Sequence, residues 1–337
     1  MRGSSLRWIA LTAVVGLGGL TACGSDDGSG NASGGSSANV VWYTAYSDSV
    51  VQSVVEKWQA THPDVRLDAV RLGTTDISAR YTGEAQKGVQ TVDVITTGDT
   101  TMMRISPQYF QNLSKTDLPA IGEYESGNVG KNYVTTNLTL QDLQYNTGKL
   151  SGTAVPSSWQ GITAADLKGK GIMVDPRAFP AAMSFYRQLQ EAYGDGFLRS
   201  LGQQHFRVTD SCEPAAQQVA AGGGNLAFPC VPGHSVDLRA QKAPIAIADL
   251  KNPPYPAQSH NLAIPAKPAH PKAAKEFAQW LLSSEGQESV CLKVYSTTNT
   301  QAKGCIPLPT DGPIKQYDAD QISKADQDKI VQLLGLK

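Results

Sequence analysis

Polar side chains that could contact a small molecule follow directly after several predicted strands. Each can donate or accept hydrogen bonds: Tyr46, Ser47, Thr74, Thr97, Asp99, Asp175, Arg177, Glu213 and His234. Because the carboxyl ends of parallel strands open at one edge of a sheet, loops at these positions are where open α/β sheets bind ligands. Hydroxyls and carboxylates in such loops commonly cap the helix that follows. The pattern therefore predicts a ligand-binding site at this edge of the sheet, but each of these residues could instead be a helix cap.

Arg177 is the charged residue with the most specific chemistry. It follows the predicted strand 171–174 directly, and its guanidinium fork suits a carboxylate, a phosphate or a phosphonate. It would also replace the N–H donor that Pro180 removes from the start of the next helix. The alternative is a salt bridge on the surface or between domains. Asp99 could bind a ligand ammonium, or pair with Arg177 when the site is empty.

The common motifs of secreted hydrolases do not occur in the sequence. There is no Gly-x-Ser-x-Gly nucleophile elbow and no His-Glu-x-x-His zinc motif, and the five histidines are scattered. A net charge of −1 gives no basic surface for nucleic acid. We therefore expect a binding protein rather than an enzyme, with no cofactor and no metal. A secreted hydrolase and a structural surface protein are the competing classes.

The hydrophobic pattern predicts an α/β protein. Residues 40–43 are β-branched and aromatic, which is typical of a buried strand. Apolar residues then recur at helical spacing over 50–58, after the N-cap candidates Ser47 and Asp48. Strands at 65–72 and 92–97 complete a β-α-β-α-β order, which indicates a parallel sheet covered by helices. Further strands are expected at 137–146, 171–174, 225–229, 245–248 and 262–265, and further helices at 181–193, 198–204, 212–221, 271–282 and 323–334.

The N-terminal segment has the parts of an export signal. Two arginines precede an apolar run at 8–20 that is too short for a comfortable membrane span. The tetrad LTAC, which ends in Cys23, matches the bacterial lipobox. We expect removal of 1–22 and lipidation of Cys23; a secretory signal without lipid or a signal anchor is the alternative. The Gly/Ser-rich stretch 23–39 would then tether the protein to the outer face of the cytoplasmic membrane.

Five cysteines divide into Cys23 and two pairs of near neighbours. We predict disulfides between Cys212 and Cys230 and between Cys291 and Cys305, because exported proteins keep their cysteines oxidised. Four buried free thiols are the alternative. A metal site is disfavoured, because no Cys-x-x-Cys spacing occurs.

Five stretches along nearly all of the mature chain carry a family resemblance. In order they read VVWYTAYSDS…VVEKWQATHPDVRLDAVRLGTT, VDVITTGD, LQYNTGKL, VPSSWQGITAADLKGKGIMVDPRA and AIPAKPAHPKAAKEFAQWLLSSEGQESV. Their order and spacing resemble the extracellular solute-binding proteins of ABC importers, in particular the branch that includes the ferric-ion-binding proteins. The resemblance implies a two-lobed α/β fold of class II periplasmic-binding-protein type with a central ligand cleft. The crossing segments would be 137–146 and 258–265, lobe 1 would be 40–140 plus 262–337, and lobe 2 would be 141–261.

The resemblance also implies a function. A protein of this family captures a small solute and delivers it to an ABC permease and its ATPase, here as a lipid-anchored monomer with no nucleic-acid partner. The iron ligands of the ferric members do not carry over. Where those members have adjacent tyrosines this chain reads CVPGH over 230–234, with Ser47 where they can have histidine and Gly98-Asp99 where they can have glutamate. A carboxylate, phosphonate or phosphate compound is therefore predicted, with ferric iron or an iron chelate as the alternative.

Overall fold

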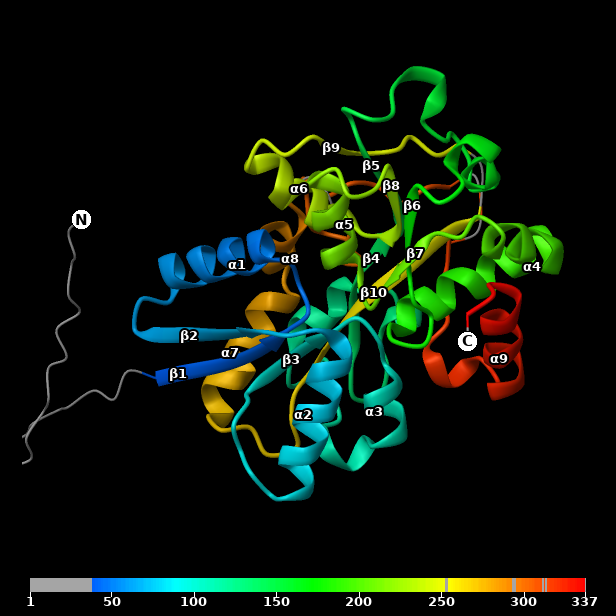
Figure 1. The fold of residues 1–337 in the computed structure, drawn as a ribbon. Coiled ribbons are helices and arrows are strands. Elements are labelled where there is room, and N and C mark those ends of the chain that lie inside the picture. The colour runs from blue at the N-terminus through cyan, green and yellow to red at the C-terminus, as the bar shows by residue number, and fades with distance from the viewer. Residues whose placement is uncertain (1–37, 252–253, 293–294, 311, 313, 337) are drawn as a thin grey trace, which may run out of the picture. The chain divides into compact units, whose positions relative to one another are not determined.

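The computed structural model describes residues 38–251, 254–292, 295–310, 312 and 314–336. The predicted signal segment, Cys23 and nearly all of the predicted tether lie outside these residues. The chain forms mixed α/β structure with two separate sheets, which confirms the predicted fold class (Figure 1). Within the described ranges, no helix has the length and apolar character needed to cross a membrane.

The first sheet is built around β1 (Ala38–Thr44), which pairs in parallel with β2 (Val65–Arg71) and with β3 (Val94–Thr97). The long strand β10 (Tyr255–Ala263) runs antiparallel to β3 and to β4 (Val134–Leu140), and β11 (Ile314–Lys315) pairs with its first residues. This sheet and its helices form the first lobe. The helices are α1 (Asp48–Thr61), α2 (Thr74–Gln86), α3 (Thr101–Ile105), α7 (Pro271–Leu282) and α8 (Ser284–Cys291).

Alternate residues of β1 supply the cores on both faces of the first sheet. Val40 and Trp42 belong to the cluster under α1 and α7, where the Trp42 ring lies 5.5 Å from the Phe277 ring between centroids. Tyr43 belongs to the cluster on the other face, together with Ile77 of α2. Because successive side chains of a strand point to opposite faces, an unbroken apolar run such as this one suits a strand that is buried on both sides.

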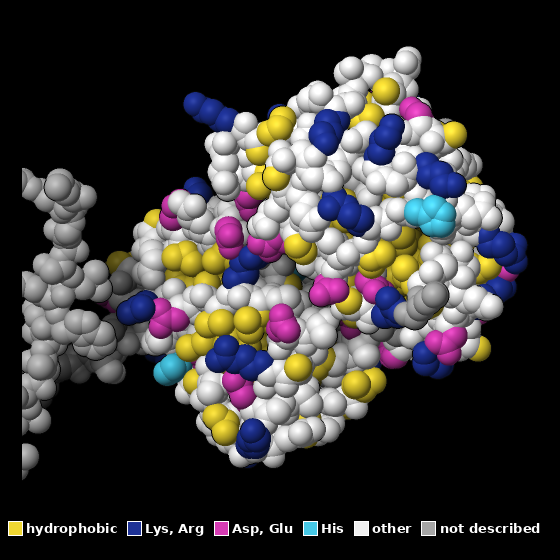
Figure 2. Space-filling view, in the orientation of Figure 1, with side chains coloured by type: hydrophobic (Ala, Val, Ile, Leu, Met, Phe, Trp, Pro, Cys, Tyr) yellow, Lys and Arg dark blue, Asp and Glu magenta, His cyan; other side chains and the backbone are white. Residues whose placement is uncertain are grey.

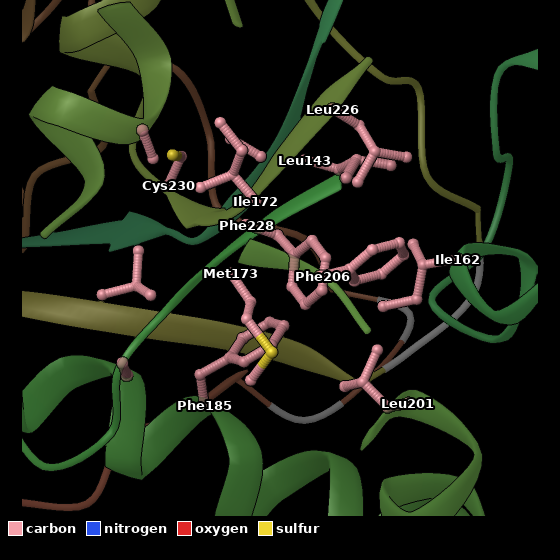
Figure 3. Packing of buried hydrophobic residues seen from close by; sticks show 14 of the residues in the cluster. Leu143, Ile162, Ile172, Met173, Phe185, Leu201, Phe206, Leu226, Phe228 and Cys230 are labelled. Atoms are coloured by element: carbon pink, nitrogen blue, oxygen red, sulfur yellow. The ribbon is translucent and has the colours of Figure 1, made fainter. Parts of the chain in front are cut away.

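The second lobe has its own sheet, in the order β7-β6-β8-β5-β9. Its strands are β5 (Asp142–Asn146), β6 (Gly171–Val174), β7 (Arg207–Thr209), β8 (Leu226–Cys230) and β9 (Ile245–Ile247), and its helices include α4 (Pro180–Gly202), α5 (Cys212–Ala220) and α6 (Pro232–Ala240). Strand β6 is parallel to β7 and β8, whereas β5 is antiparallel to β8 and β9. The core of this lobe contains Phe185, Phe206 and Phe228, with the rings of Phe206 and Phe228 5.8 Å apart (Figure 3).

In the described residues, seven short 3-10 turns lie in the connections. They are η1 (Pro107–Tyr109), η2 (Pro119–Glu123), η3 (Ser126–Asn128), η4 (Gly152–Ala154), η5 (Gln160–Thr163), η6 (Ala165–Leu167) and η7 (Ala319–Gln321). The predicted helices 181–193 and 198–204 are the two parts of α4, which is kinked at Gly194, where φ is +77°. Strand β7 and helices α6 and α8 were not expected from the sequence pattern, since each is short.

Two crossing segments join the lobes. The strand predicted at 137–146 is two strands, β4 in the first sheet and β5 in the second, with Gln141 between them. The Gln141 N–H donates to the carbonyl of Pro256 at 2.7 Å, so the two crossings lie side by side. Strand β10 belongs to the first sheet, so the second crossing falls between β9 and β10, earlier in the chain than the predicted 258–265.

The C-terminal helix α9 (Lys324–Leu333) packs on the second lobe, which corrects the assignment of all of 262–337 to the first. Ile330 and Leu334 are buried in the second-lobe core, and Lys329 Nζ forms an ion pair with Asp195 Oδ2 of α4 at 2.8 Å. The amphipathic pattern predicts this helix but does not say which lobe its apolar side will meet.

The segment just before α9 contacts both lobes. The Tyr317 N–H donates to Ser184 Oγ of α4 at 2.8 Å. The next residue, Asp318, pairs through Oδ2 with Arg104 Nη2 of α3 at 3.2 Å. The chain therefore passes between the lobes a third time.

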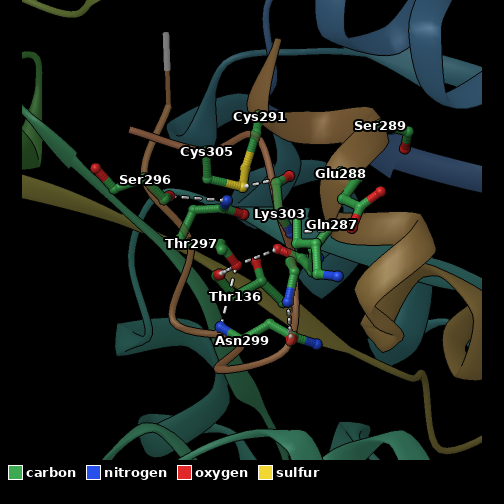
Figure 4. The surroundings of a disulfide bond; sticks show 12 residues. Thr136, Gln287, Glu288, Ser289, Cys291, Ser296, Thr297, Asn299, Lys303 and Cys305 are labelled. Carbon is green, nitrogen blue, oxygen red and sulfur yellow. Dashed lines mark hydrogen bonds between the residues drawn. A yellow bond between two sulfur atoms is a disulfide. The ribbon is translucent and has the colours of Figure 1, made fainter. Parts of the chain in front are cut away.

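Both predicted disulfides are present. Cys212, at the start of α5, is bonded to Cys230 at the end of β8. Cys291, at the end of α8, is bonded to Cys305 (Figure 4). Near the second disulfide, Thr297 Oγ1 donates to the carbonyl of Thr136 in β4 at 3.0 Å. On the loop-entropy model, closing loops of these lengths stabilises the fold by about 3 kcal/mol each.

Asp142 is an unusual residue at the start of β5. Its side chain is buried, Oδ1 accepts a hydrogen bond from Gln144 Nε2 at 3.1 Å, and Oδ2 has no partner among the described residues. Burial raises the pKa of Asp142 to about 8, and the bond from Gln144 opposes this only in part. An Asp carboxyl in an unfolded chain has a pKa of about 4.

We predict that Asp142→Asn makes the protein more stable at pH 8 but not at pH 4. The folded protein keeps the Asp142 proton at pH values where the unfolded chain has lost it. The wild type therefore loses stability between about pH 4 and pH 8, by up to about 1.4 kcal/mol per pH unit. Urea unfolding at pH 5, 6, 7 and 8 measures this. A stability difference between the two proteins that is the same at every pH would contradict the prediction.

Candidate functional site

A cavity of about 330 Å³ lies where the two lobes and the crossing segments meet. Cavities of this size and larger bind small molecules in many proteins. The first lobe contributes Ala45, Ser47, Arg71, Leu72, Gly73, Thr74, Asp76 and Tyr295, together with Gln258 and His260 of β10; the second contributes Phe179, Ser211, Cys212, Glu213, Pro229, Cys230, Val231 and His234; the first crossing segment contributes Gln141. Along the middle of the face drawn in Figure 2, acidic side chains lie with basic ones among them.

Five helices begin at this cavity. The N-cap residues of α1, α2, α4, α5 and α6 all line it: Ser47, Gly73, Phe179, Ser211 and Val231. In these described helices no N-cap side chain accepts a hydrogen bond from a backbone N–H of its own helix, and the N–H groups of a first turn have no acceptor within the helix. The helix dipoles add positive potential at the same place. These termini could hold an anionic group, and the carboxylates of Asp76 and Glu213 in the same lining act against one.

Arg71 is a basic group in the cavity wall. It ends β2, and its Nη2 pairs with Glu213 Oε2 of the second lobe at 2.9 Å. Its Nε donates to the carbonyl of Tyr46 at 2.9 Å and lies 3.3 Å from Asp48 Oδ1. Burial tends to raise the pKa of Glu213, but the hydrogen bond and charge of Arg71 hold it below its ordinary value. Arg71 and Glu213 thus form an ion pair across the cavity.

The floor of the cavity is polar and uncharged. It is formed by Gln141 from the first crossing and by Gln258 and His260 from β10. Burial lowers the pKa of His260 to about 3, so its imidazole is neutral at physiological pH. The imidazole stacks on the Tyr46 ring, with centroids 4.4 Å apart.

Four of the nine predicted contact residues line the cavity. They are Ser47 and Thr74 in the first lobe and Glu213 and His234 in the second. Thr74 Oγ1 accepts from the Gly98 N–H at 3.1 Å, so it also supports the neighbouring loop. Burial lowers the pKa of His234, although the nearby Glu213 carboxylate acts in the opposite direction.

Three other predicted residues of the first lobe lie outside the cavity lining. Tyr46 is buried and donates from its hydroxyl to Asn137 Oδ1 at 2.5 Å. Thr97 is buried in β3. Asp99 Oδ1 accepts from the Thr101 N–H at 2.6 Å, at the start of α3. None of these three residues lines the cavity.

Asp175 and Arg177 are not brought to the cavity either. The Arg177 guanidinium pairs with Asp175 in the same turn, with Nη2 2.7 Å from Oδ2 and Nε 3.0 Å from Oδ1. Arg177 lines a separate surface pocket with Pro180 and Lys324. A carboxylate two residues earlier thus binds the guanidinium locally. The hydrogen bond from Arg177 lowers the pKa of Asp175.

Comparison with known proteins identifies the family. The family model described as bacterial extracellular solute-binding protein matches residues 43–288. The chain belongs to this family. It is a family of binding proteins rather than enzymes, and its members act outside the cytoplasm. Comparison with curated proteins gave no match.

Solved structures show that the solute-binding protein has the two-lobed fold of periplasmic binding proteins. A substrate-binding protein of an ABC transporter from Agrobacterium tumefaciens is 13% identical, with a TM-score of 0.74 over 89% of this chain and 94% of that one. AfuA from Actinobacillus pleuropneumoniae, with fructose-6-phosphate bound, is 19% identical, with a TM-score of 0.71 over 90% and 100%. Iron-bound HitA from Pseudomonas aeruginosa is 17% identical, with a TM-score of 0.62 over 88% and 97%.

In the described part of the solute-binding protein, no group of three or more His, Cys, Asp and Glu side chains is placed to hold a metal ion. The residues that sequence reasoning missed are Arg71, Asp76, Gln141, Gln258, His260 and Tyr295. The strand-end rule that predicts Thr74 would also have found Arg71, which closes the strand before it. The floor residues give no such signal, because they lie within or between strands.

Gly233 lies where the two lobes of the solute-binding protein approach each other closely. A Cβ atom at this position of α6 would lie 2.0 Å from Tyr295 Oη and 2.8 Å from Ser47 Oγ. The Tyr295 hydroxyl itself donates to Ser47 Oγ at 3.3 Å. Glycine is therefore needed here because the first lobe occupies the space of a side chain.

We predict that Gly233→Ala holds the lobes apart without unfolding either of them. The added methyl group cannot fit while Tyr295 and Ser47 keep their places. Small-angle X-ray scattering should show a larger radius of gyration than for the wild type, with an unchanged circular dichroism spectrum. Adding Tyr295→Phe removes the nearest atom and should restore part of the wild-type value. An unchanged radius in the single variant would contradict the prediction.

Proposed function

We propose that this protein is the receptor of an ABC importer and captures a small anionic solute between its lobes. The solute would be a carboxylate, phosphonate or phosphate compound, and the loaded receptor would deliver it to a permease whose partner ATPase supplies the energy. The observation that carries the proposal is the convergence of five helix N-termini and Arg71 on one cavity.

Helix N-termini would favour an anionic solute over a neutral one. A negative group near one helix N-terminus is stabilised by roughly 0.3–1 kcal/mol, and by up to about 2 kcal/mol in a partly buried site. An anion that contacts several of these termini would also compete with Glu213 for the Arg71 guanidinium, which sits 2.9 Å from that carboxylate. Glu213 thus neutralises Arg71 when no solute is bound, and works against an anion that approaches it.

The structural neighbours are consistent with this class of solute. AfuA holds a phosphorylated sugar in its structure. Another neighbour, from Trichodesmium, holds iron and citrate. An iron chelate with carboxylate groups is itself an anion and could use the same helix N-termini, so we keep it as the second candidate.

The export features complete the proposal. Removal of 1–22, lipidation of Cys23 and a tether over 23–39 would hold a monomeric receptor beside its permease on the outer face of the cytoplasmic membrane. Mass spectrometry of the membrane fraction should find a diacylated N-terminal peptide beginning at Cys23. Recovery of the unmodified protein from the medium would contradict the anchor.

A thermal-shift screen with organic acids, phosphonates, phosphate esters and ferric citrate tests the anionic class. A solute at 100 times its Kd should stabilise the protein by about 2.7 kcal/mol. If none of these compounds raises the Tm while a neutral sugar or a polyamine does, the anionic proposal fails.

We predict effects of opposite sign for two substitutions at the ion pair. Arg71→Gln removes the cation and should weaken binding of the anionic solute at least tenfold. Glu213→Gln removes the competing carboxylate and should tighten it. Isothermal titration calorimetry measures both, with Arg177→Gln as the control, since Arg177 lies in a separate pocket.

The directions of the two affinity changes distinguish an ion pair that contacts the solute from one that only holds the lobes together. If its role were only to hold the lobes together, both substitutions would change affinity in the same direction. Loss of affinity in Glu213→Gln as large as in Arg71→Gln would therefore contradict direct binding of the anion by Arg71.

A further inference from the structure

The disulfide between Cys212 and Cys230 lies in the wall of the cavity. Both cysteines are buried, and both belong to the cavity lining. The bond joins the first residue of α5 to the last residue of β8. The N-cap residue of α6, Val231, follows Cys230 directly. The disulfide therefore cross-links the starts of two of the five helices that begin at the cavity.

Each of these two helix starts contacts the first lobe. Glu213, the second residue of α5, pairs through Oε2 with Arg71 Nη2 at 2.9 Å. Gly233, the second residue of α6, lies so close to Tyr295 and Ser47 that a Cβ atom would meet both side chains. Two contacts between the lobes thus come from helices that one covalent bond joins.

The start of α5 has a short attachment to the second sheet. It follows β7, a strand of three residues at the edge of that sheet, where Val208 is exposed. Segments with few buried apolar contacts are the ones that open most readily. Cys230, in contrast, ends β8, which lies between β6 and β5 in the middle of the sheet. The disulfide therefore ties the helix start that carries Glu213 to a central strand.

We propose that the Cys212–Cys230 disulfide positions the second-lobe side of the binding site. It makes the contacts of Glu213 and Gly233 with the first lobe form together when the cleft closes. Without the bond, the start of α5 depends on its edge strand and on the packing of the helix itself. A restraint that is present before closure reduces the conformational entropy that closure costs. This inference rests on the proposed function, because closure matters to a protein that captures a solute between its lobes.

The competing role for this disulfide is general stabilisation of the fold. Loop closure constrains the unfolded chain wherever a disulfide lies, and this effect does not depend on the cavity. Removing a merely stabilising bond would lower the Tm and leave the shape of the folded protein unchanged. The shape of the folded protein and the local rates of amide exchange therefore distinguish the two roles.

Small-angle X-ray scattering and amide hydrogen exchange on solute-free protein test the proposal. The variant Cys212→Ala/Cys230→Val removes the bond and keeps apolar side chains in its place. We expect a larger radius of gyration than for the wild type, with an unchanged circular dichroism spectrum. Exchange should become at least tenfold faster over 211–221 and 230–241, and change less than twofold over 180–202 in α4.

Phe206→Leu is the matched control for loss of stability. Phe206 is buried in the core of the same lobe, where its ring lies 5.8 Å from the Phe228 ring between centroids, and it does not line the cavity. The smaller side chain should lower the Tm, because it leaves a cavity in the core. The radius of gyration should stay at the wild-type value.

Three outcomes would overturn the inference. The first is a folded disulfide variant with the wild-type radius of gyration. The second is faster exchange spread evenly over α4, α5 and α6, which general destabilisation produces. The third is failure to fold both of Cys212→Ala/Cys230→Val and of Cys212→Ser/Cys230→Ser, which would assign the bond to the fold. No solute is present in these measurements, so each of these failures leaves the anionic proposal intact.

Discussion

The geometry of parallel strand connections is the constraint on which the site depends. A helix that returns the chain between parallel strands must begin at the carboxyl edge of the sheet. Here β1 and β2 lead into α1 and α2, and β6, β7 and β8 lead into α4, α5 and α6. The carboxyl edges of the two sheets meet at one cavity, so all five helices begin there. The gathering of helix N-termini at the cavity is therefore a property of the topology, whereas the charged side chains Arg71, Asp76 and Glu213 in its lining are one cation and two anions.

The same arrangement concentrates unpaired polar groups in one place. The first-turn N–H groups of five helices lie at the cavity without acceptors in their own helices. The folded protein keeps these groups unpaired because rigid strands and helices fix their positions. Arg71 and Glu213 pair with each other across the same cavity at 2.9 Å.

Much of this could be predicted from sequence, for reasons that differ between elements. Helix α7 has the predicted bounds, because its apolar stripe is strong and a proline marks its start. Ser47 and Thr74 line the cavity because strand-end loops lie at the sheet edge. Arg177 does not line it and pairs with Asp175 two residues earlier, and short-range competition of this kind is not part of the strand-end rule.

The floor of the site could not be predicted in the same way. Gln141 and Gln258 are far apart in the chain and meet only because β4 pairs with β10. Polar residues in such strands look like solvent-facing positions until the pairing is known. The sequence also does not predict which lobe α9 packs on. An amphipathic helix needs an apolar surface to cover its apolar face, but its pattern does not say which surface that is.

The third passage of the chain between the lobes has a mechanical consequence. Two lobes that are joined only by two adjacent crossing segments can open and close like a hinge and can also rotate about the connection. Here Tyr317 contacts α4 of the second lobe, and the next residue, Asp318, contacts α3 of the first lobe. Contacts of this kind to both lobes would oppose rotation of one lobe relative to the other.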